Sequence, residues 1–300
     1  MIQKVIITNH LNEIFELPLS TPEQSGFVVT SISGLNPPKA TINFTESSVL
    51  DGGYYNSARV SKRNIRFSLK FLKNLSIEEC RHRSYRIFPI KKKVTMTFVT
   101  DERLLTTEGY VEANEAVIFS KTTSTSISVL CPSPYFESLI EYENEFGTIS
   151  PSFEFPFSNE STSLPLIEFG TYSYDHELTV EYPGEIEVGG IFEINCTGAV
   201  EDITIGDEKG NMMTIDTSRI YDNTGTALGS GDTIVINTIA GKKNIYLRRS
   251  GVEIPIFYCI DRHFDWIELY PGDNTIHYNA ASGIDNMLIK LTYPIYYQGI

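Results

Sequence analysis

Cys131-Pro132-Ser133-Pro134-Tyr135-Phe136 is the stretch at which this chain of 300 residues changes character. Proline cannot continue a helix or donate to the ladder of a central strand, and it holds the residue before it extended. Residues 1–136 contain 16 Lys and Arg against 12 Asp and Glu, whereas residues 137–300 contain 8 against 26. The Pro-x-Pro corner is therefore predicted to be a domain boundary, with a weakly basic domain before it and a strongly acidic one after it.

Size and composition indicate a folded protein of two domains. A chain of 300 residues is long enough for about two domains of roughly 150 residues each, and 41% hydrophobic residues are typical of a folded protein. No segment approaches the roughly 20 apolar residues of a membrane-spanning helix, and the first residues lack the apolar core and cleavage site of a secretory signal. We therefore expect a protein made in the cytoplasm and not inserted in a membrane.

The first half of the chain is predicted to be a sheet with one helix packed on it. Apolar runs, several of them alternating with polar residues, predict strands at 5–7, 27–32, 65–71, 94–98, 109–112 and 126–130. Ser76 followed by Glu79 is a capping box, and Pro89 ends the pattern, so residues 76–88 are predicted to form the only helix.

The second half is predicted to be a β-sandwich of the jelly-roll type. Residues 137–165 are expected to be an irregular linker or covering segment, in which Phe153, Phe155 and Phe157 alternate as in an edge strand. Roughly ten short strands separated by turn signals follow over residues 166–300, for example on either side of the turn 206–211. The fold class is therefore mainly β, with a β-rich domain at 1–136 and a sandwich at 166–300.

A search for catalytic and metal-binding patterns predicts neither. No nucleophile elbow, phosphate-binding loop or zinc-binding helix motif is present, and the five histidines are scattered. Four cysteines lie far apart, at Cys80, Cys131, Cys196 and Cys259, and are expected to be buried free thiols. The net charge of −14 disfavours nucleic-acid binding, and the basic cluster at 81–93 is best explained by a solvated helix face. We expect no catalytic residue, no metal and no cofactor.

Aromatic residues near turns are the candidate binding residues. Tyr54 and Tyr55 flank the turn at Asp51-Gly52-Gly53, and tyrosine is enriched in protein–protein interfaces, although it is also an ordinary strand residue. Trp266 is the only tryptophan. A tryptophan on a sandwich either stacks on a sugar ring or fills a core or an interface, and the sequence leaves both alternatives open.

A series of short motifs extends over about 110 residues of the first half of the chain. They are Phe27-Val28-Val29-Thr30-Ser31-Ile32-Ser33-Gly34-Leu35-Asn36-Pro37-Pro38, Asp51-Gly52-Gly53-Tyr54-Tyr55, Arg63-Asn64-Ile65-Arg66-Phe67, Tyr85-Arg86-Ile87-Phe88 with Lys91-Lys92-Lys93-Val94, Phe119-Ser120-Lys121, and Cys131-Pro132-Ser133-Pro134-Tyr135-Phe136. In their order and spacing these motifs resemble the distal tail proteins of long-tailed (siphovirus-type) bacteriophages, the tail component family.

The resemblance implies a structural, non-enzymatic protein of the virion tail tip. Residues 1–136 would be a belt domain that assembles into a homo-hexameric ring, between the tail tube and the tail-tip or receptor-binding proteins. The C-terminal sandwich would be galectin-like. Tyr54, Tyr55 and Arg59 are the residues that we expect at contacts between subunits. The alternative function is a glycan-binding module for adsorption to the host surface, with Trp266 in contact with the glycan or with an interface; the resemblance itself does not carry over a sugar site, because the arginines and asparagine of the galectin motif are absent around Trp266.

Overall fold

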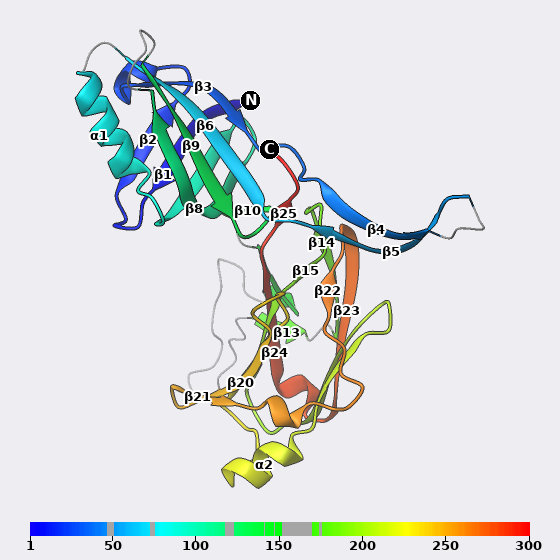
Figure 1. The fold of residues 1–300 in the computed structure, drawn as a ribbon. Coiled ribbons are helices and arrows are strands. Elements are labelled where there is room, and N and C mark those ends of the chain that lie inside the picture. The colour runs from blue at the N-terminus through cyan, green and yellow to red at the C-terminus, as the bar shows by residue number, and fades with distance from the viewer. Residues whose placement is uncertain are drawn as a thin grey trace, which may run out of the picture. The chain divides into compact units, whose positions relative to one another are not determined.

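The computed structural model describes residues 1–46, 51–72, 76–117, 123–140, 142–146, 148–151, 170–173 and 176–300. The chain divides into two compact units, which are shown in Figure 1. Unit 1 comprises Met1–Ile140 together with Tyr296–Ile300, and unit 2 comprises Glu141–Ile295. Residues 296–300, which the sequence pattern places in the C-terminal domain, are thus part of unit 1.

Unit 1 is built on one antiparallel sheet of nine strands. Seven of them form a continuous path in the order β2 (Ile14–Pro18), β1 (Ile2–Thr8), β7 (Lys93–Thr100), β8 (Leu104–Ala116), β9 (Ser124–Cys131), β6 (Arg63–Phe71) and β3 (Phe27–Ser33). Strand β10 (Phe136–Ser138) joins β8 and also pairs with β25 (Tyr296–Tyr297). The strands predicted in the first half all exist, and alternate residues of β6 and β7 are buried as the period of two requires.

Helix α1 (Ile77–Ile87) packs on this sheet and begins as the sequence predicts. The Glu79 backbone N–H donates to Ser76 Oγ at 3.1 Å, which satisfies one of the orphan donors of the first turn. The helix buries Cys80, Ser84 and Ile87. Below it lies an aromatic core, in which the Phe67 ring centroid is 5.6 Å from that of Phe88 and 6.4 Å from that of Phe98.

Two further strands of unit 1 pair only with each other. Strands β4 (Ala40–Glu46) and β5 (Gly53–Val60) form a two-stranded sheet that extends from the rest of unit 1 in Figure 1. We call this hairpin the arm. The turn predicted at Asp51-Gly52 lies at its tip, where Gly52 has φ +88°, but Gly53, Tyr54 and Tyr55 belong to the strand rather than to a loop.

Unit 2 contains two antiparallel sheets that face each other. The larger has the order β11 (Tyr142–Glu145), β24 (Met287–Tyr293), β16 (Ile191–Cys196), β19 (Thr233–Asn237), β20 (Asn244–Arg249), β21 (Val252–Pro255). The smaller has the order β14 (Glu177–Tyr182), β23 (Gly272–Ser282), β17 (Glu201–Asp207), β18 (Met212–Ile215). Tyr182 of the smaller sheet contacts Tyr293 of the larger at 5.9 Å between ring centroids, and this contact joins the two layers of a sandwich. The mainly β fold class is confirmed.

Two short strand pairs and some departures from the sequence pattern complete unit 2. Strand β15 (Val188–Gly189) pairs with β22 (Glu268–Leu269), and β12 (Thr148–Pro151) pairs with β13 (Gly170–Ser173). Strands β10, β11 and β12 occupy part of the segment predicted to be irregular. Residues 152–165, with Phe153, Phe155 and Phe157, lie outside the described residues, as does the motif at 119–121.

A second helix, α2 (Ser218–Thr224), corrects the prediction that residues 76–88 form the only one. It is seven residues long, too short for a clear apolar period. The sequence does contain a signal for the end of this helix, which is Gly225. A glycine commonly closes a helix in the left-handed conformation, and Gly225 takes that conformation here. Within the described residues no helix is long and apolar enough to span a membrane.

The four cysteines are buried free thiols, as the sequence predicts. Burial raises the pKa of Cys131 to about 11, of Cys196 to about 12 and of Cys259 to about 11. At pH 8 the reactive thiolate of these residues should therefore be more than about 100-fold less populated than that of an exposed cysteine. We expect iodoacetamide to leave the native protein unlabelled and to label all four cysteines in urea, as counted by mass spectrometry. Rapid labelling of any of the three in the native protein would contradict this.

Candidate functional site

The arm carries an exposed apolar face. The register of β4 and β5 places Phe44 opposite Tyr55 and Ile42 opposite Ala58, so these four side chains share one face of the ribbon. The Phe44 and Tyr55 ring centroids are 6.4 Å apart, in an edge-to-face arrangement. Ile42, Phe44 and Tyr55 are 51%, 57% and 63% exposed. Large side chains that are clustered and this accessible are typical of a surface that a partner covers.

The opposite face of the arm is polar. Asn43 Nδ2 donates to Ser57 Oγ at 3.0 Å across the strands, and the next pairs are Thr41 with Arg59 and Thr45 with Tyr54. The three candidate contact residues are thus divided between the faces, with Tyr55 on the apolar face and Tyr54 and Arg59 on the polar one.

Sequence reasoning missed two residues of the apolar face, Ile42 and Phe44. The signal was present, because Ala40, Ile42 and Phe44 alternate with threonine and asparagine as in an amphipathic strand.

The root of the arm is a loop with strict geometry, at residues 34–37. Gly34 has φ +86°, and a Cβ at this position would lie 2.1 Å from the carbonyl oxygen of Asn64. Both the left-handed backbone and the close approach require glycine. This explains why the break in the chain between β3 and β4 begins with a glycine.

Arg63, at the start of β6, holds this loop from inside unit 1. Its side chain reaches four backbone carbonyl oxygens through three different nitrogens. Nε donates to Pro134 at 2.7 Å, Nη1 donates to Gly34 at 2.5 Å and to Asn36 at 3.0 Å, and Nη2 donates to Gln298. The residue is 3% exposed. Its guanidinium carbon also lies 4.3 Å from the centroid of the Phe136 ring.

The Arg63 site gives the Pro-x-Pro corner a structural role. The carbonyl oxygen of Pro134 accepts a hydrogen bond from Arg63, and the ring of Phe136 lies against the guanidinium. The stretch at 131–136 therefore forms part of the binding site of a buried arginine. Burial lowers the pKa of the Arg63 guanidinium, which reflects the cost of removing its charge from water. The hydrogen bonds to four carbonyl oxygens offset this cost, because each is assisted by the charge of the guanidinium.

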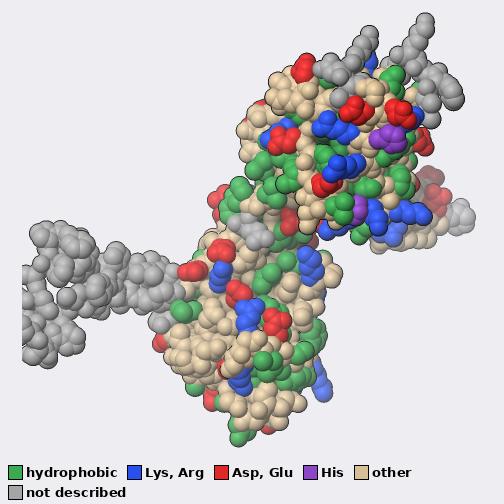
Figure 2. All heavy atoms as spheres, turned by 90° about the vertical axis from the view of Figure 1, so that its left-hand side faces the viewer, with side chains coloured by type: hydrophobic (Ala, Val, Ile, Leu, Met, Phe, Trp, Pro, Cys, Tyr) green, Lys and Arg blue, Asp and Glu red, His purple; other side chains and the backbone are tan. Residues whose placement is uncertain are grey.

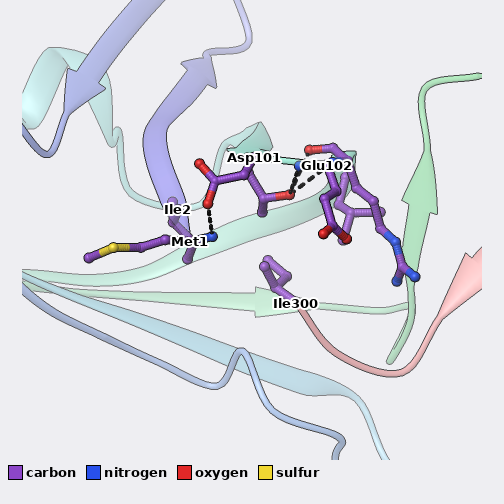
Figure 3. Close-up of a pocket in the computed structure, with 8 residues that line it drawn as sticks. Met1, Ile2, Asp101, Glu102 and Ile300 are labelled. Atoms are coloured by element: carbon purple, nitrogen blue, oxygen red, sulfur yellow. Dashed lines mark hydrogen bonds and ion pairs between the residues drawn. The ribbon is translucent and has the colours of Figure 1, made fainter.

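A cavity of about 390 Å³ lies beside this region of unit 1 (Figure 3). Met1, Ile2, Asp101, Glu102 and Ile300 are among its lining residues. The N-terminal ammonium group pairs with the Asp101 carboxylate, and Arg103 lies over the Tyr297 ring at 4.4 Å. In the part of the chain that the structure describes, no group of three or more His, Cys, Asp or Glu side chains is arranged to hold a metal ion.

Trp266 lies in unit 2, in the loop before β22, among other aromatic rings. Its ring centroid is 5.0 Å from that of Phe264 and 5.9 Å from that of Phe257, and Lys243 Nζ is 5.1 Å from it. Trp266 is half-buried, whereas Phe257 is 46% exposed. The tryptophan therefore packs within a cluster that still reaches the surface.

Several cations of the basic cluster at 81–93 are paired with glutamates. Arg81 is 3.6 Å from Glu78, Lys93 is 2.6 Å from Glu108, and Arg86 pairs with Glu13. Figure 2 shows Lys and Arg side chains beside Asp and Glu on the face of unit 1 that it draws. This mixture differs from the single-sign surface that a nucleic-acid backbone attracts.

Comparison with known proteins rests on solved structures. No protein-family model matches the chain, and no curated protein matches its sequence. The crystal structure of SPP1 Dit (gp 19.1) matches with a TM-score of 0.63 at 11% identity, over 97% of this chain and 98% of that one. The chain has the fold of that protein. SPP1 Dit is described as a paradigm of the hub adsorption apparatus in phages that infect Gram-positive bacteria.

Two structures of the phage P2 baseplate in its activated conformation also match, at lower similarity. The one with Ca has a TM-score of 0.44 at 14% identity, over 99% of this chain and 98% of that one. The one with Sr has a TM-score of 0.42 at 12% identity, over 96% and 97%. Of these three structures, SPP1 Dit has the TM-score that establishes a shared fold.

Proposed function

We propose that this protein is a structural component of a bacteriophage tail, the distal tail or baseplate hub, and that it has no enzymatic activity. The observation that carries the proposal is the fold shared with SPP1 Dit over nearly the full length of both chains. The ordered motifs of the first half, from the strand at 27–38 to the corner at 131–136, support it independently.

In this proposal the protein forms a homo-hexameric ring through the domain at residues 1–136. A head-to-tail interface closes into a ring when the rotation between copies fits. The apolar face of the arm, with Tyr55, Phe44 and Ile42, lies against the neighbouring copy, and Tyr54 and Arg59 make contacts from the polar face. An isolated two-stranded hairpin is marginally stable in water, so a neighbour that covers the arm also stabilises it.

The ring joins other tail proteins at the virion tail tip. One face of the ring binds the tail tube, and the other binds the tail-tip or receptor-binding proteins. The protein is made in the cytoplasm of the host bacterium and needs no cofactor, nucleic acid or membrane for this role.

The mass of the purified protein in solution tests the proposal. We expect light scattering to give about six times 33.8 kDa, and negative-stain images of the same peak to show rings with a central hole. A monomer at high concentration, with and without tail-tube and tail-tip proteins, would contradict ring formation.

A second candidate function is glycan binding by the sandwich of unit 2, and the aromatic cluster around Trp266 favours it. A half-buried ring beside an exposed one is a platform on which a sugar can stack. We expect Trp266→Ala to abolish a glycan-array signal of the intact protein, and Tyr221→Ala, an exposed aromatic on α2, to leave it unchanged. The absence of any signal from the unmodified protein would reject this function.

A further inference from the structure

Residues 296–300 pack on unit 1, first on its sheet and then on the root of the arm. Strand β25 pairs with β10, with Tyr297 opposite Phe136 and Tyr296 opposite Glu137. The Tyr296 ring stacks on that of Tyr135 at 6.5 Å between centroids, and Arg103 covers Tyr297. These contacts fix the first two residues of the segment on the sheet.

The remaining residues of the segment reach the root of the arm directly. The Ile300 backbone N–H donates to the carbonyl oxygen of Leu35 at 3.2 Å. The carbonyl oxygen of Gln298 accepts from the same Arg63 guanidinium that holds Gly34 and Asn36. The root loop is thus bound twice, once by the segment itself and once through Arg63.

We propose that residues 296–300 are a latch that fixes the direction in which the arm leaves unit 1, and that Arg63 is the positioning residue that couples the latch to the arm. The inference concerns a single copy of the chain and does not depend on ring formation. Arginine suits this position because its planar fork presents several donors in fixed directions at once. Lysine is a point charge with three donors on a flexible stem and cannot reach the four carbonyl groups in the same geometry.

Hydrogen exchange on three variants tests the latch. The first is Arg63→Lys, and the second is a chain that stops after Tyr297, which keeps β25 and removes only Gln298, Gly299 and Ile300. The control is Lys62→Met, which removes a charge from the neighbouring exposed residue. In the first two variants we expect the amides of β4 and β5 nearest the root, at residues 40–42 and 58–60, to exchange at least about tenfold faster, because charge-assisted hydrogen bonds are lost. The control should exchange like the unmodified chain.

The amides of α1 and β7 serve as the internal reference in the same samples. The measurement is made at a protein concentration at which light scattering gives the same mass for all chains, so that contacts between copies contribute equally. Faster exchange at the root with unchanged exchange in α1 and β7 supports the latch. Unchanged exchange at the root, or equally faster exchange throughout unit 1, would overturn it.

Discussion

Replacing Phe44 and Tyr55 together by serine is expected to abolish ring assembly and to leave unit 1 folded. Both side chains are more than half exposed in the single chain, so their loss removes little burial from it. In the ring they would be covered by the neighbouring copy. Two aromatic side chains that lose this burial weaken each interface by about 3 kcal/mol, or more than about 100-fold in the association constant.

The matched control is Tyr54→Ser, which removes an equally exposed tyrosine from the polar face of the same hairpin. We expect this variant to form rings with a weaker affinity than the unmodified protein but a stronger one than the double variant. Light scattering over a dilution series measures the difference. Rings of undiminished affinity in the double variant would refute the assignment of the apolar face to the interface.

Phe67→Ala is expected to lower the free energy of unfolding of unit 1 by about 3–5 kcal/mol. Phe67 is fully buried and contacts Phe88 and Phe98, so the substitution leaves a cavity in the aromatic core beneath α1. Small domains are stable by about 5–15 kcal/mol, and the variant would lose a large part of that margin.

The readout for Phe67→Ala must report on unit 1. The only tryptophan, Trp266, lies in unit 2, so its fluorescence follows the other unit. Hydrogen exchange of β6 and β7 amides in a urea series gives the stability of unit 1 instead. Phe44→Ala makes the same chemical change at an exposed site and should cost less than about 0.5 kcal/mol in a single copy. A cost for Phe67→Ala as small as that for Phe44→Ala would show that the core is not continuous at Phe67.

The elements that were predictable from the sequence are those whose signal is local. The N-cap, the apolar period and the terminating proline of helix α1 all lie within or next to the helix. In β6, apolar and polar residues alternate along the strand itself. The tip of the arm was marked by Asp51-Gly52. Its strands were not predicted, although Ile42 and Phe44 alternate with polar residues, because the run is short and follows the Gly-Pro-Pro break of a loop.

The site around Arg63 at the root of the arm depends on contacts between residues far apart in sequence, which no local sequence pattern predicts. Arg63 donates a hydrogen bond to Gln298, which lies 235 residues further along the chain. The acceptor is a backbone carbonyl oxygen, which every residue has, so the sequence of the partner gives no signal. The pairing of β25 with β10 is equally remote. Both are consequences of tertiary packing, and a sequence pattern can at most mark Arg63 as a charged residue at the start of an apolar strand.

The pairing of β10 with β25 also sets an order of events during synthesis. The ribosome completes β10 and must then translate roughly 155 residues of unit 2 before residues 296–300 emerge, which takes roughly 8–30 s at about 5–20 residues per second. Until then Arg63 lacks one of its carbonyl acceptors, and the root loop lacks the hydrogen bond from Ile300. If residues 296–300 act as the proposed latch, a nascent chain holds its arm in the final direction only after its sandwich has been made. Polypeptides released early would then lack a fixed arm.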